Sequence, residues 1–247
     1  MKKRKHRALR WIGGIAAALV ILVAAGAIIW VNKTYKPNEE AKAVLSGTQK
    51  VTVTKDTYIE FLPTDRQPDK GFIFYPGGLV EPEAYAPLCE KIAEQGYLVV
   101  IVPMTANLAI LSPNKAEGVQ KAYPFIKTWA IGGHSLGGVM ACRYANSHED
   151  IAGVVLYAAY PESDELEGSS KKIISIYGSL DGVAKLDKVK GAKLPLDAKL
   201  KEIQGGNHSY FGSYGLQKGD NEATISNAEQ LMMAASYTTD FLKRLSE

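Results

Sequence analysis

The chain of 247 residues contains 46% hydrophobic and 22% charged side chains, which suits one folded α/β domain and excludes disordered, collagen-like and disulfide-scaffold proteins. The net charge is +3, but the first ten residues hold six lysines and arginines and no acid, so removing these six leaves −3 for the remainder. A slightly acidic remainder without a basic stripe argues against nucleic acid as a partner.

The basic residues 1–10 precede an apolar stretch, residues 11–31, that contains no charged side chain. At about 1.5 Å rise per residue, a helix of this length crosses a hydrocarbon layer of about 30 Å. Trp11 and Trp30 lie near its ends, where indole rings favour the headgroup level. We predict a single-pass cell-membrane protein with a cytoplasmic tail (residues 1–10), a transmembrane signal-anchor (residues 11–31) and an extracellular remainder.

The alternative for this segment is a cleaved secretory signal, because Ala25-Gly26-Ala27 offers a small-residue cleavage pattern. The apolar region of a signal peptide usually has about 7 to 15 residues. Here the apolar character continues through Val31, so the length favours an uncleaved anchor.

Residues 32–50 are polar and predict a short stalk, and residues 51–247 predict the folded domain. Hydrophobic residues alternate between Val51 and Phe61, which suggests an antiparallel hairpin at the edge of a sheet. From Gly71 onward, short β-branched or aromatic runs alternate with amphipathic stretches, a pattern typical of a mostly parallel sheet with helices on both faces. The predicted parallel strands are residues 72–75, 98–102, 129–132, 153–157, 173–177 and 200–203. The predicted helices are residues 82–95, 115–126, 136–147 and 227–245.

A GxSxG turn, Gly133-His134-Ser135-Leu136-Gly137, joins one predicted strand to the next predicted helix. Its glycines suit a sharp turn at which neighbouring backbones come into contact. The turn presents the Ser135 hydroxyl at a helix N-terminus, where the partial positive charge favours developing negative charge. We therefore predict Ser135 as the nucleophile of a serine hydrolase.

A serine hydroxyl needs a general base, which is normally a histidine, and the chain contains four histidines. His6 lies in the basic tail, His134 is expected to point elsewhere from within the turn, and His148 ends a helix beside two acids. His208 follows the last predicted strand, in the chain order of nucleophile, acid and base that suits such a sheet. We predict His208 as the general base.

The carboxylate that orients the base is expected a few residues beyond the end of a strand. Asp181 stands at that position after residues 173–177. It also suits a turn with the glycine that follows it, and this is compatible with catalysis. Its competitors are Asp164, Asp187 and Asp197.

Two backbone amides commonly stabilise the oxyanion in acyl transfer. We expect the amide of Leu136 to be one of them. The second is expected from the loop Pro76-Gly77-Gly78-Leu79 after the first parallel strand, because its glycines let N–H groups turn toward the site. Either Gly78 or Leu79 supplies this amide, and the sequence leaves the choice open.

Cys89 and Cys142 lie on apolar faces of predicted helices and are expected to be buried thiols, although an extracellular domain permits a disulfide. Their spacing does not suit a zinc site. Residues 104–113 and the aromatic residues 209–217 are possible walls of a substrate cleft, although aromatic loops more often serve packing.

With these motifs in place, the chain from Phe72 to its C-terminus resembles the α/β-hydrolase superfamily, particularly its small lidless bacterial members grouped with dienelactone-hydrolase-like proteins. The matching segments are residues 75–78, 132–138, 178–182 and 205–208. The resemblance implies a sheet of the eight-stranded type, a triad of Ser135, Asp181 and His208, and neither a metal nor an organic cofactor. Dienelactone hydrolases themselves carry a cysteine nucleophile, so Ser135 departs from their pattern and argues against a dienelactone substrate.

Many lipases of this superfamily insert a helical lid after the strand that corresponds to residues 153–157. Here only the polar and acidic residues 161–172 intervene, which favours an open cleft and esters with short or medium acyl groups. We predict a serine hydrolase that cleaves small carboxylic esters through an acyl-serine intermediate. The alternatives are a non-catalytic membrane-anchored binding module of the same fold, and an acyltransferase or amidase on the same triad; the sequence leaves the oligomeric state open.

Overall fold

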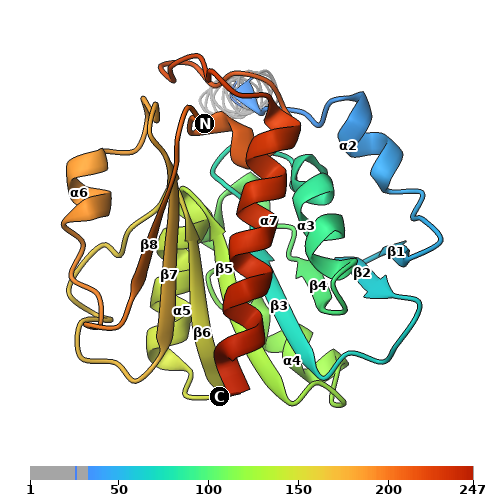
Figure 1. Ribbon diagram of the computed structural model, residues 1–247. Helices are drawn as coiled ribbons and strands as arrows, with labels where there is room; N and C mark the ends of the chain where they lie inside the picture. Colours follow the sequence, from blue (N-terminus) through green and yellow to red (C-terminus); the bar gives the residue numbers. More distant parts are fainter. Residues whose placement is uncertain (1–25, 27–32, 247) are drawn as a thin grey trace, which may run out of the picture. The chain divides into compact units, whose positions relative to one another are not determined.

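The structure is a computed structural model that describes residue 26 and residues 33–246. One compact unit begins at Tyr35. Its strands are β1 (Val51–Lys55), β2 (Ile59–Pro63), β3 (Lys70–Tyr75), β4 (Leu98–Ile101), β5 (Thr128–His134), β6 (Ile151–Tyr157), β7 (Lys172–Gly178) and β8 (Lys199–Ile203). They form one sheet in the order β1-β2-β4-β3-β5-β6-β7-β8 (Figure 1).

The sheet is antiparallel at one edge and parallel elsewhere. β1 and β2 form the predicted hairpin, in which Val53 lies opposite Phe61, and β2 pairs antiparallel with β4. All pairs from β4 through β3 to β8 are parallel, which confirms the predicted mostly parallel sheet. β8 ends the sheet at the other edge, and its first four residues are exposed.

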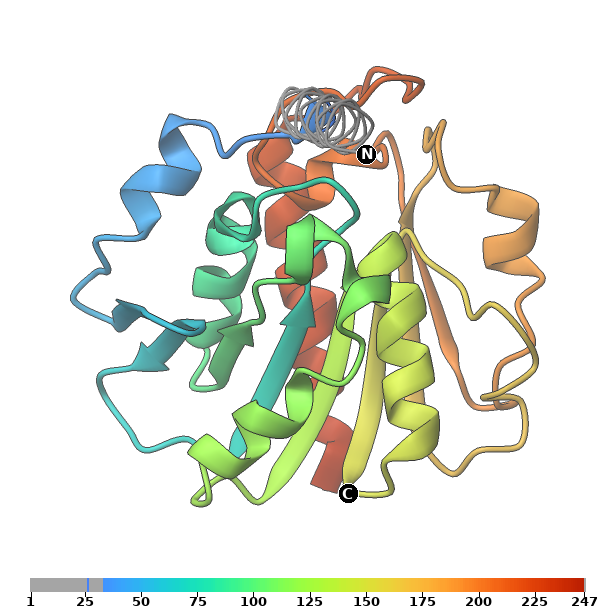
Figure 2. The same cartoon turned by 180° about the vertical axis from the view of Figure 1, so that it is seen from behind.

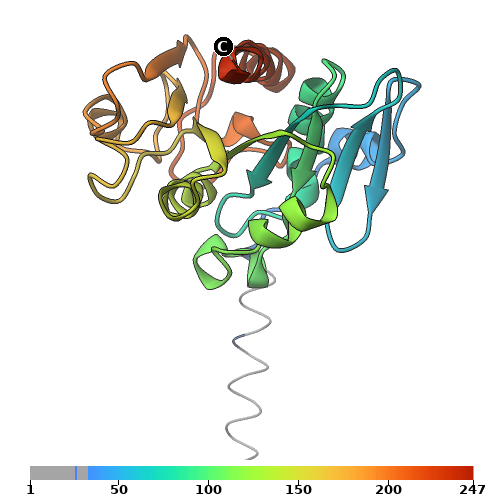
Figure 3. The same cartoon turned by 90° about the horizontal axis from the view of Figure 1, so that it is seen from below.

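Helices cover both faces of the sheet. The α-helices are α2 (Glu39–Val44), α3 (Ala86–Ala93), α4 (Ala116–Ala122), α5 (Leu136–Ser147), α6 (Leu186–Lys190) and α7 (Asn227–Lys243). Short 3₁₀ helices are η1 (Pro82–Tyr85), η2 (Thr105–Asn107), η3 (Ala109–Leu111), η4 (Ser209–Phe211) and η5 (Arg244–Ser246). α3 and α7 lie in front of the sheet in Figure 1, and α4 and α5 lie in front of it in the reverse view of Figure 2. The view from below in Figure 3 shows α7 and α5 on opposite sides.

The two faces bury two separate hydrophobic clusters because side chains alternate along each strand. In β3, Phe72 and Phe74 join the cluster under α3 and α7, whereas Ile73 and Tyr75 join the cluster under α4 and α5. The cysteines Cys89 and Cys142 are free buried thiols, one in each cluster, as the sequence predicted. Burial raises the pKa of both thiols above the ordinary value.

Prolines and caps explain where several helices begin and end. The predicted helix 115–126 stops at Ala122, because Tyr123 precedes Pro124 and leaves the helical conformation at φ −123° and ψ 67°. The predicted helix 82–95 opens as η1 and becomes α3 only at Ala86. α7 starts at a capping box in which Ser226 and Glu229 bond to each other's backbone amides.

The segment predicted as a stalk contains ordered structure from Tyr35 onward. Tyr35 forms a parallel bridge with Val80, and the Asn38 side chain caps α2 by accepting from the Ala41 amide at 2.9 Å. Apart from residue 26, the predicted transmembrane segment, residues 11–31, lies outside the described residues. Among residue 26 and residues 33–246, no helix has both the length and the apolar character that crossing a membrane requires.

Candidate active site

The GxSxG turn adopts a strained strand-to-helix geometry. Ser135 follows β5 directly and precedes α5, with φ 51° and ψ −123°, a backbone conformation that non-glycine residues rarely adopt. The Ser135 amide donates to the Tyr157 carbonyl at the end of β6 (3.0 Å) and helps to hold this conformation. A Cβ at Gly133 or Gly137 would overlap the Tyr75 carbonyl oxygen, so the turn packs directly against the end of β3.

Ser135 stands where a nucleophile can be reached and stabilised. It is partly exposed, whereas the residues that precede it in β5 from Trp129 onward are buried. Leu136 is the first residue of α5, so its amide has no partner within the helix. The helix N-terminus therefore offers a free N–H group and a partial positive charge beside the Ser135 hydroxyl.

The structure brings His208 and Asp181 together from two neighbouring parallel strands. Asp181 follows β7 and His208 follows β8, and their side chains are 0% and 1% exposed. His208 Nδ1 lies 2.9 Å from Asp181 Oδ2. Asp181 Oδ1 accepts from the amides of Val183 and Ala184 at 2.9 and 2.7 Å, which fixes the carboxylate. This contact engages Nδ1 and fixes the orientation of the imidazole, so Nε2 is the ring nitrogen that is left for another interaction.

His208 Nε2 is buried and makes no hydrogen bond within the described part of the chain, Ser135 Oγ included. Catalytic hydrogen bonds are often long before substrate binds. A buried ring nitrogen without a partner costs free energy, so it is expected to have a use.

The competing carboxylates lie on the surface. Asp164 pairs with Lys193, and Asp197 pairs with Lys172 at 2.6 Å. Asp187 is exposed on α6. The structure therefore places only Asp181, among these four candidates, against His208.

His134 contacts the predicted base, which corrects the expectation that it points elsewhere. Its ring centroid lies 4.4 Å from that of His208, and its Nδ1 lies 2.9 Å from the Tyr85 hydroxyl. That hydroxyl also accepts from the Gly77 amide at 3.0 Å. Burial, followed by the neighbouring His208, holds the pKa of His134 well below its usual value. A neutral imidazole therefore supports the ring of His208. His148 is remote from this cluster and stacks on Tyr144.

The loop after β3 distinguishes the two proposed oxyanion donors. The Leu79 amide donates to the Asn107 carbonyl at 2.8 Å, so of the two alternatives Leu79 is already hydrogen-bonded within the protein, which favours Gly78. The Gly78 amide makes no hydrogen bond to another residue that the structure describes. A Cβ at Gly78 would lie 3.1 Å from Leu136 Cδ2, so these two residues are neighbours. Across the residues that the structure describes, no hydrogen-bond acceptor pairs with the amide of Gly78 or of Leu136.

Residues 104–113 contribute an apolar wall near this pair. Leu108 lies 3.6 Å from the position of a Cβ at Gly78, and the side chains of Ile110 and Leu111 are about half exposed. In the aromatic loop after His208, Phe211 and Tyr214 are buried and belong to the core. The first loop is therefore the better candidate for substrate contact.

Two features near the site gave no recognisable signal in the sequence. The Tyr35 amide donates to the Leu79 carbonyl, and the Tyr35 carbonyl accepts from the Glu81 amide. The predicted stalk therefore pairs with the loop after β3, called the glycine loop below. The carboxylate of Asp220 accepts from backbone amides next to Asp181 and at His208.

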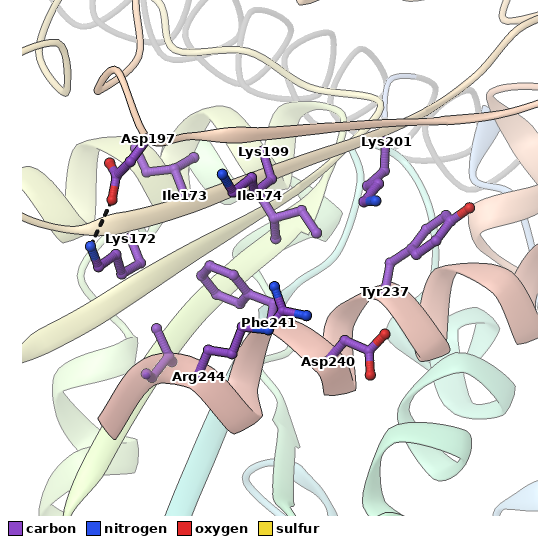
Figure 4. Close-up of a pocket in the computed structure, with 11 residues that line it drawn as sticks. Lys172, Ile173, Ile174, Asp197, Lys199, Lys201, Tyr237, Asp240, Phe241 and Arg244 are labelled. Atoms are coloured by element: carbon purple, nitrogen blue, oxygen red, sulfur yellow. Dashed lines mark hydrogen bonds and ion pairs between the residues drawn. The ribbon is translucent and has the colours of Figure 1, made fainter. Parts of the chain in front are cut away.

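A cavity of about 280 Å³ lies elsewhere, between the first residues of β7 and β8 and the end of α7 (Figure 4). Its lining includes Lys172, Lys199 and Arg244. It lies toward the amino ends of these strands, whereas Ser135 follows the carboxyl end of β5. The cavity therefore does not belong to the candidate site. Among residue 26 and residues 33–246, no group of three or more His, Cys, Asp and Glu side chains is placed to hold a metal ion.

Comparison with known proteins agrees with this fold. The family profile described as "Alpha/beta hydrolase family" matches residues 71–232, more than half of the chain. Similar solved structures include a predicted CIB-like hydrolase from Thermoplasma acidophilum, with 14% identity, a TM-score of 0.58, and coverage of 77% of this chain and 99% of that chain. The esterase domain of a Rhodothermus marinus protein has 13% identity, a TM-score of 0.57 and coverage of 79% and 98%. Est1E from Butyrivibrio proteoclasticus has 11% identity, a TM-score of 0.57 and coverage of 80% and 99%. No protein of curated function matches the sequence.

Proposed function

Since the chain belongs to the alpha/beta hydrolase family, we propose that it is a serine hydrolase that cleaves carboxylic esters through an acyl-serine intermediate. The observation that carries the proposal is the buried hydrogen bond between His208 and Asp181, which leaves Nε2 without a partner. A carboxylate that holds Nδ1–H leaves the lone pair on Nε2, on the side of the ring away from the carboxylate, as a general base requires. Ser135, in the strained turn, supplies the hydroxyl.

In the proposed reaction, Nε2 of His208 removes the proton from Ser135 Oγ as the oxygen attacks the ester carbonyl. The amides of Leu136 and Gly78 stabilise the oxyanion of the tetrahedral intermediate. His208 then returns the proton to the leaving alcohol, and an acyl-serine remains. Water, activated by the same base, hydrolyses the acyl-serine and regenerates Ser135.

For the substrate, we propose small esters with a short or medium acyl group. The apolar side chain of Leu108 beside Gly78 supports a pocket for an acyl chain of this kind. Est1E, one of the structurally similar proteins, has been solved with ferulic acid bound, so an aromatic acyl group belongs in any substrate panel. We also propose that the chain belongs to the dienelactone-hydrolase-like members of the family.

We further propose that residues 11–31 anchor the protein in the cell membrane, with residues 1–10 in the cytoplasm and the hydrolase domain outside. The support is the uncharged apolar stretch with its basic flank. Full-length protein should stay in the membrane pellet after an alkaline wash, and protease added to intact cells should digest the domain. A mature N-terminus at Ile28 would overturn the anchor.

The catalytic proposal is tested by labelling the full-length protein in detergent with a fluorophosphonate, followed by mass-spectrometric mapping of the adduct. We expect the adduct on Ser135, and loss of ester hydrolysis in Ser135→Ala. The control is Ser170→Ala, which changes an exposed serine. A folded protein without an adduct, or a Ser135→Ala variant with full activity, would contradict the proposal. Hydrolysis rates across p-nitrophenyl esters and a feruloyl ester would then define the acyl preference.

A further inference from the structure

Asp220 connects the loop that carries Asp181 to the loop that carries His208. It lies between η4 and α7, and its carboxylate is partly buried. Oδ1 accepts from the amide of Gly182 at 2.9 Å and from the amide of His208 itself at 3.3 Å. Oδ2 accepts from the amide and the hydroxyl of Ser209 at 2.8 and 2.6 Å. One side chain therefore holds both loops.

The residue after Asp220 makes a second connection between the same loops. The Asn221 side-chain amide donates to the Leu180 carbonyl at 3.0 Å, and the Asn221 carbonyl accepts from the Asn207 side chain at 2.8 Å. A Cβ at Gly182 would lie 2.8 Å from the Asn221 amide nitrogen, so the packing leaves no room there. Residues 220 and 221 thus fill the space between the two loops.

Other hydrogen bonds join the two segments only before Asp181 and His208: the Ser179 amide donates to the Ile203 carbonyl at 3.0 Å, and the Gly205 amide donates to the Ser179 hydroxyl at 2.8 Å. The Leu180 amide donates to the Gly206 carbonyl at 2.8 Å, before the acid and the base are reached. At Asp181 and His208 themselves, the Asp220 carboxylate links the two backbones, because it accepts from the amide of Gly182 and from the amide of His208. The Asp220 carboxylate is therefore placed to influence the alignment of the His208–Asp181 hydrogen bond.

A carboxylate suits this position better than any other group. Three backbone amides from the two loops and one hydroxyl converge on its two oxygens, and each of these groups donates. An ionised carboxylate only accepts, and charge-assisted hydrogen bonds are stronger than neutral ones. An asparagine would turn an NH₂ group toward at least one of these donors.

We propose that Asp220 is a positioning residue that sets the geometry of His208 and Asp181 without touching the reacting atoms. The proposal rests on the proposed function, because it assigns Asp220 a role in the same reaction. Misplacement of a catalytic group by about 1 Å can cost on the order of 100-fold in rate. Loss of the carboxylate should therefore lower kcat while substrate binding is kept.

The test compares Asp220→Asn and Asp220→Ala with the full-length wild-type protein. We expect kcat per fluorophosphonate-titrated site to fall roughly 100-fold in Asp220→Ala and somewhat less in Asp220→Asn, with KM nearly unchanged. The control is Asp187→Asn, which removes an exposed carboxylate from α6 and should leave kcat unchanged. Equal kcat per titrated site in wild type and both Asp220 variants would overturn the proposal.

A second measurement separates this proposal from the catalytic one. The proton shared by His208 Nδ1 and Asp181 should give a far-downfield NMR resonance that broadens or disappears in Asp220→Asn and persists in Asp187→Asn. If Ser135→Ala keeps full activity, the proposed function fails, and the resonance still decides the role of Asp220. A sharp, unshifted resonance in both Asp220 variants would show that the carboxylate does not position His208.

Discussion

Asp181 divides its two carboxylate oxygens between the backbone and the imidazole. Oδ1 accepts from two amides of its own turn, and Oδ2 faces His208 Nδ1. The two backbone amides thus fix the rotation of the carboxylate independently of its hydrogen bond to the histidine. The hydrogen-bonded nitrogen keeps its proton, so the other nitrogen carries the lone pair.

Replacing Asp181 by asparagine should therefore change the tautomer rather than the packing. The amide NH₂ can donate to Nδ1, which moves the ring proton to Nε2 and removes the base. We expect kcat of Asp181→Asn to fall by about 10⁴-fold in steady-state ester hydrolysis, with KM little changed. Asp197→Asn, which removes an exposed carboxylate, serves as the control. Near-normal turnover in Asp181→Asn would remove Asp181 from the mechanism.

His134 should make the stability of the protein depend on pH. Its pKa in the folded state lies well below the usual value, mainly because the ring is buried. The unfolded chain therefore binds an additional proton below about pH 6.5, and the free energy of unfolding falls as the pH decreases through that value. Above about pH 6.5 both states are neutral at this site, and the contribution is constant.

Urea unfolding at two pH values measures this effect. Between pH 7.5 and 5.5 the wild type should lose more stability than His134→Asn, which has no ionisable group at this position, and the difference should be at most about 1.4 kcal/mol. His148→Asn is the matched control, because it removes a histidine at the end of α5 that lies away from the site. Parallel pH profiles for wild type and His134→Asn would show that His134 is protonated equally in both states.

The elements that carry the proposed nucleophile and acid were predictable because each motif follows a strand with a clear apolar run. The strand before the base, β8, is mostly polar, so His208 was predictable from the elimination of the other histidines and from chain order. Short polar helices such as α2 and α6 were missed, because their few buried positions give no period. Leu79 and Gly78 differ as candidate oxyanion donors only because the Leu79 amide donates to the Asn107 carbonyl, and Asn107 lies in a loop that is distant in the sequence. The sequence did not predict a role for Asp220, because Asp220 follows His208 in the chain, whereas the acid of the expected order precedes the histidine. Contacts of this kind depend on tertiary structure, which local patterns do not encode.

The contact between the turn of α5 and the end of β3 leaves no space for a side chain. In Gly137→Ala, the new Cβ would overlap backbone atoms of Tyr75 and Pro76, so the two elements must separate. We expect a loss of about 1–3 kcal/mol or more in urea unfolding, together with loss of ester hydrolysis. Gly168→Ala is the control, because a Cβ there meets no atom within 4 Å. Equal stability of both variants would mean that the turn can relax without cost.

At the scale of the whole folded unit, the residues from Tyr35 to Asn38 connect loops from both halves of the chain. The backbone of Tyr35 pairs with the glycine loop, its hydroxyl accepts from the Lys218 amide, and its ring lies 5.5 Å from that of Tyr214. The Asn38 amide donates to the Ser213 carbonyl. The segment thus joins the loop of the proposed oxyanion donor to the loop after His208.

A truncated fragment should reveal this role. Compared with residues 33–247, residues 37–247 lack both main-chain hydrogen bonds of Tyr35, each worth about 0.5–1.5 kcal/mol net. We expect the shorter fragment to be about 1–3 kcal/mol less stable in urea unfolding and to hydrolyse esters more slowly. Tyr35→Phe in the longer fragment keeps the main-chain bonds and should change little. Identical stability of the two fragments would show that the segment contributes nothing.

The exposed strand β8 has a consequence for self-association. No strand in the described part of the chain pairs with its outer side, so a second chain could add a strand there and start aggregation. Lys199, Lys201 and Glu202 stand on this strand, and antiparallel pairing of two copies centred on Lys201 would bring like charges together. Salt screens such repulsion, so concentrated protein should remain dispersed in dilute buffer and scatter more light as ionic strength rises.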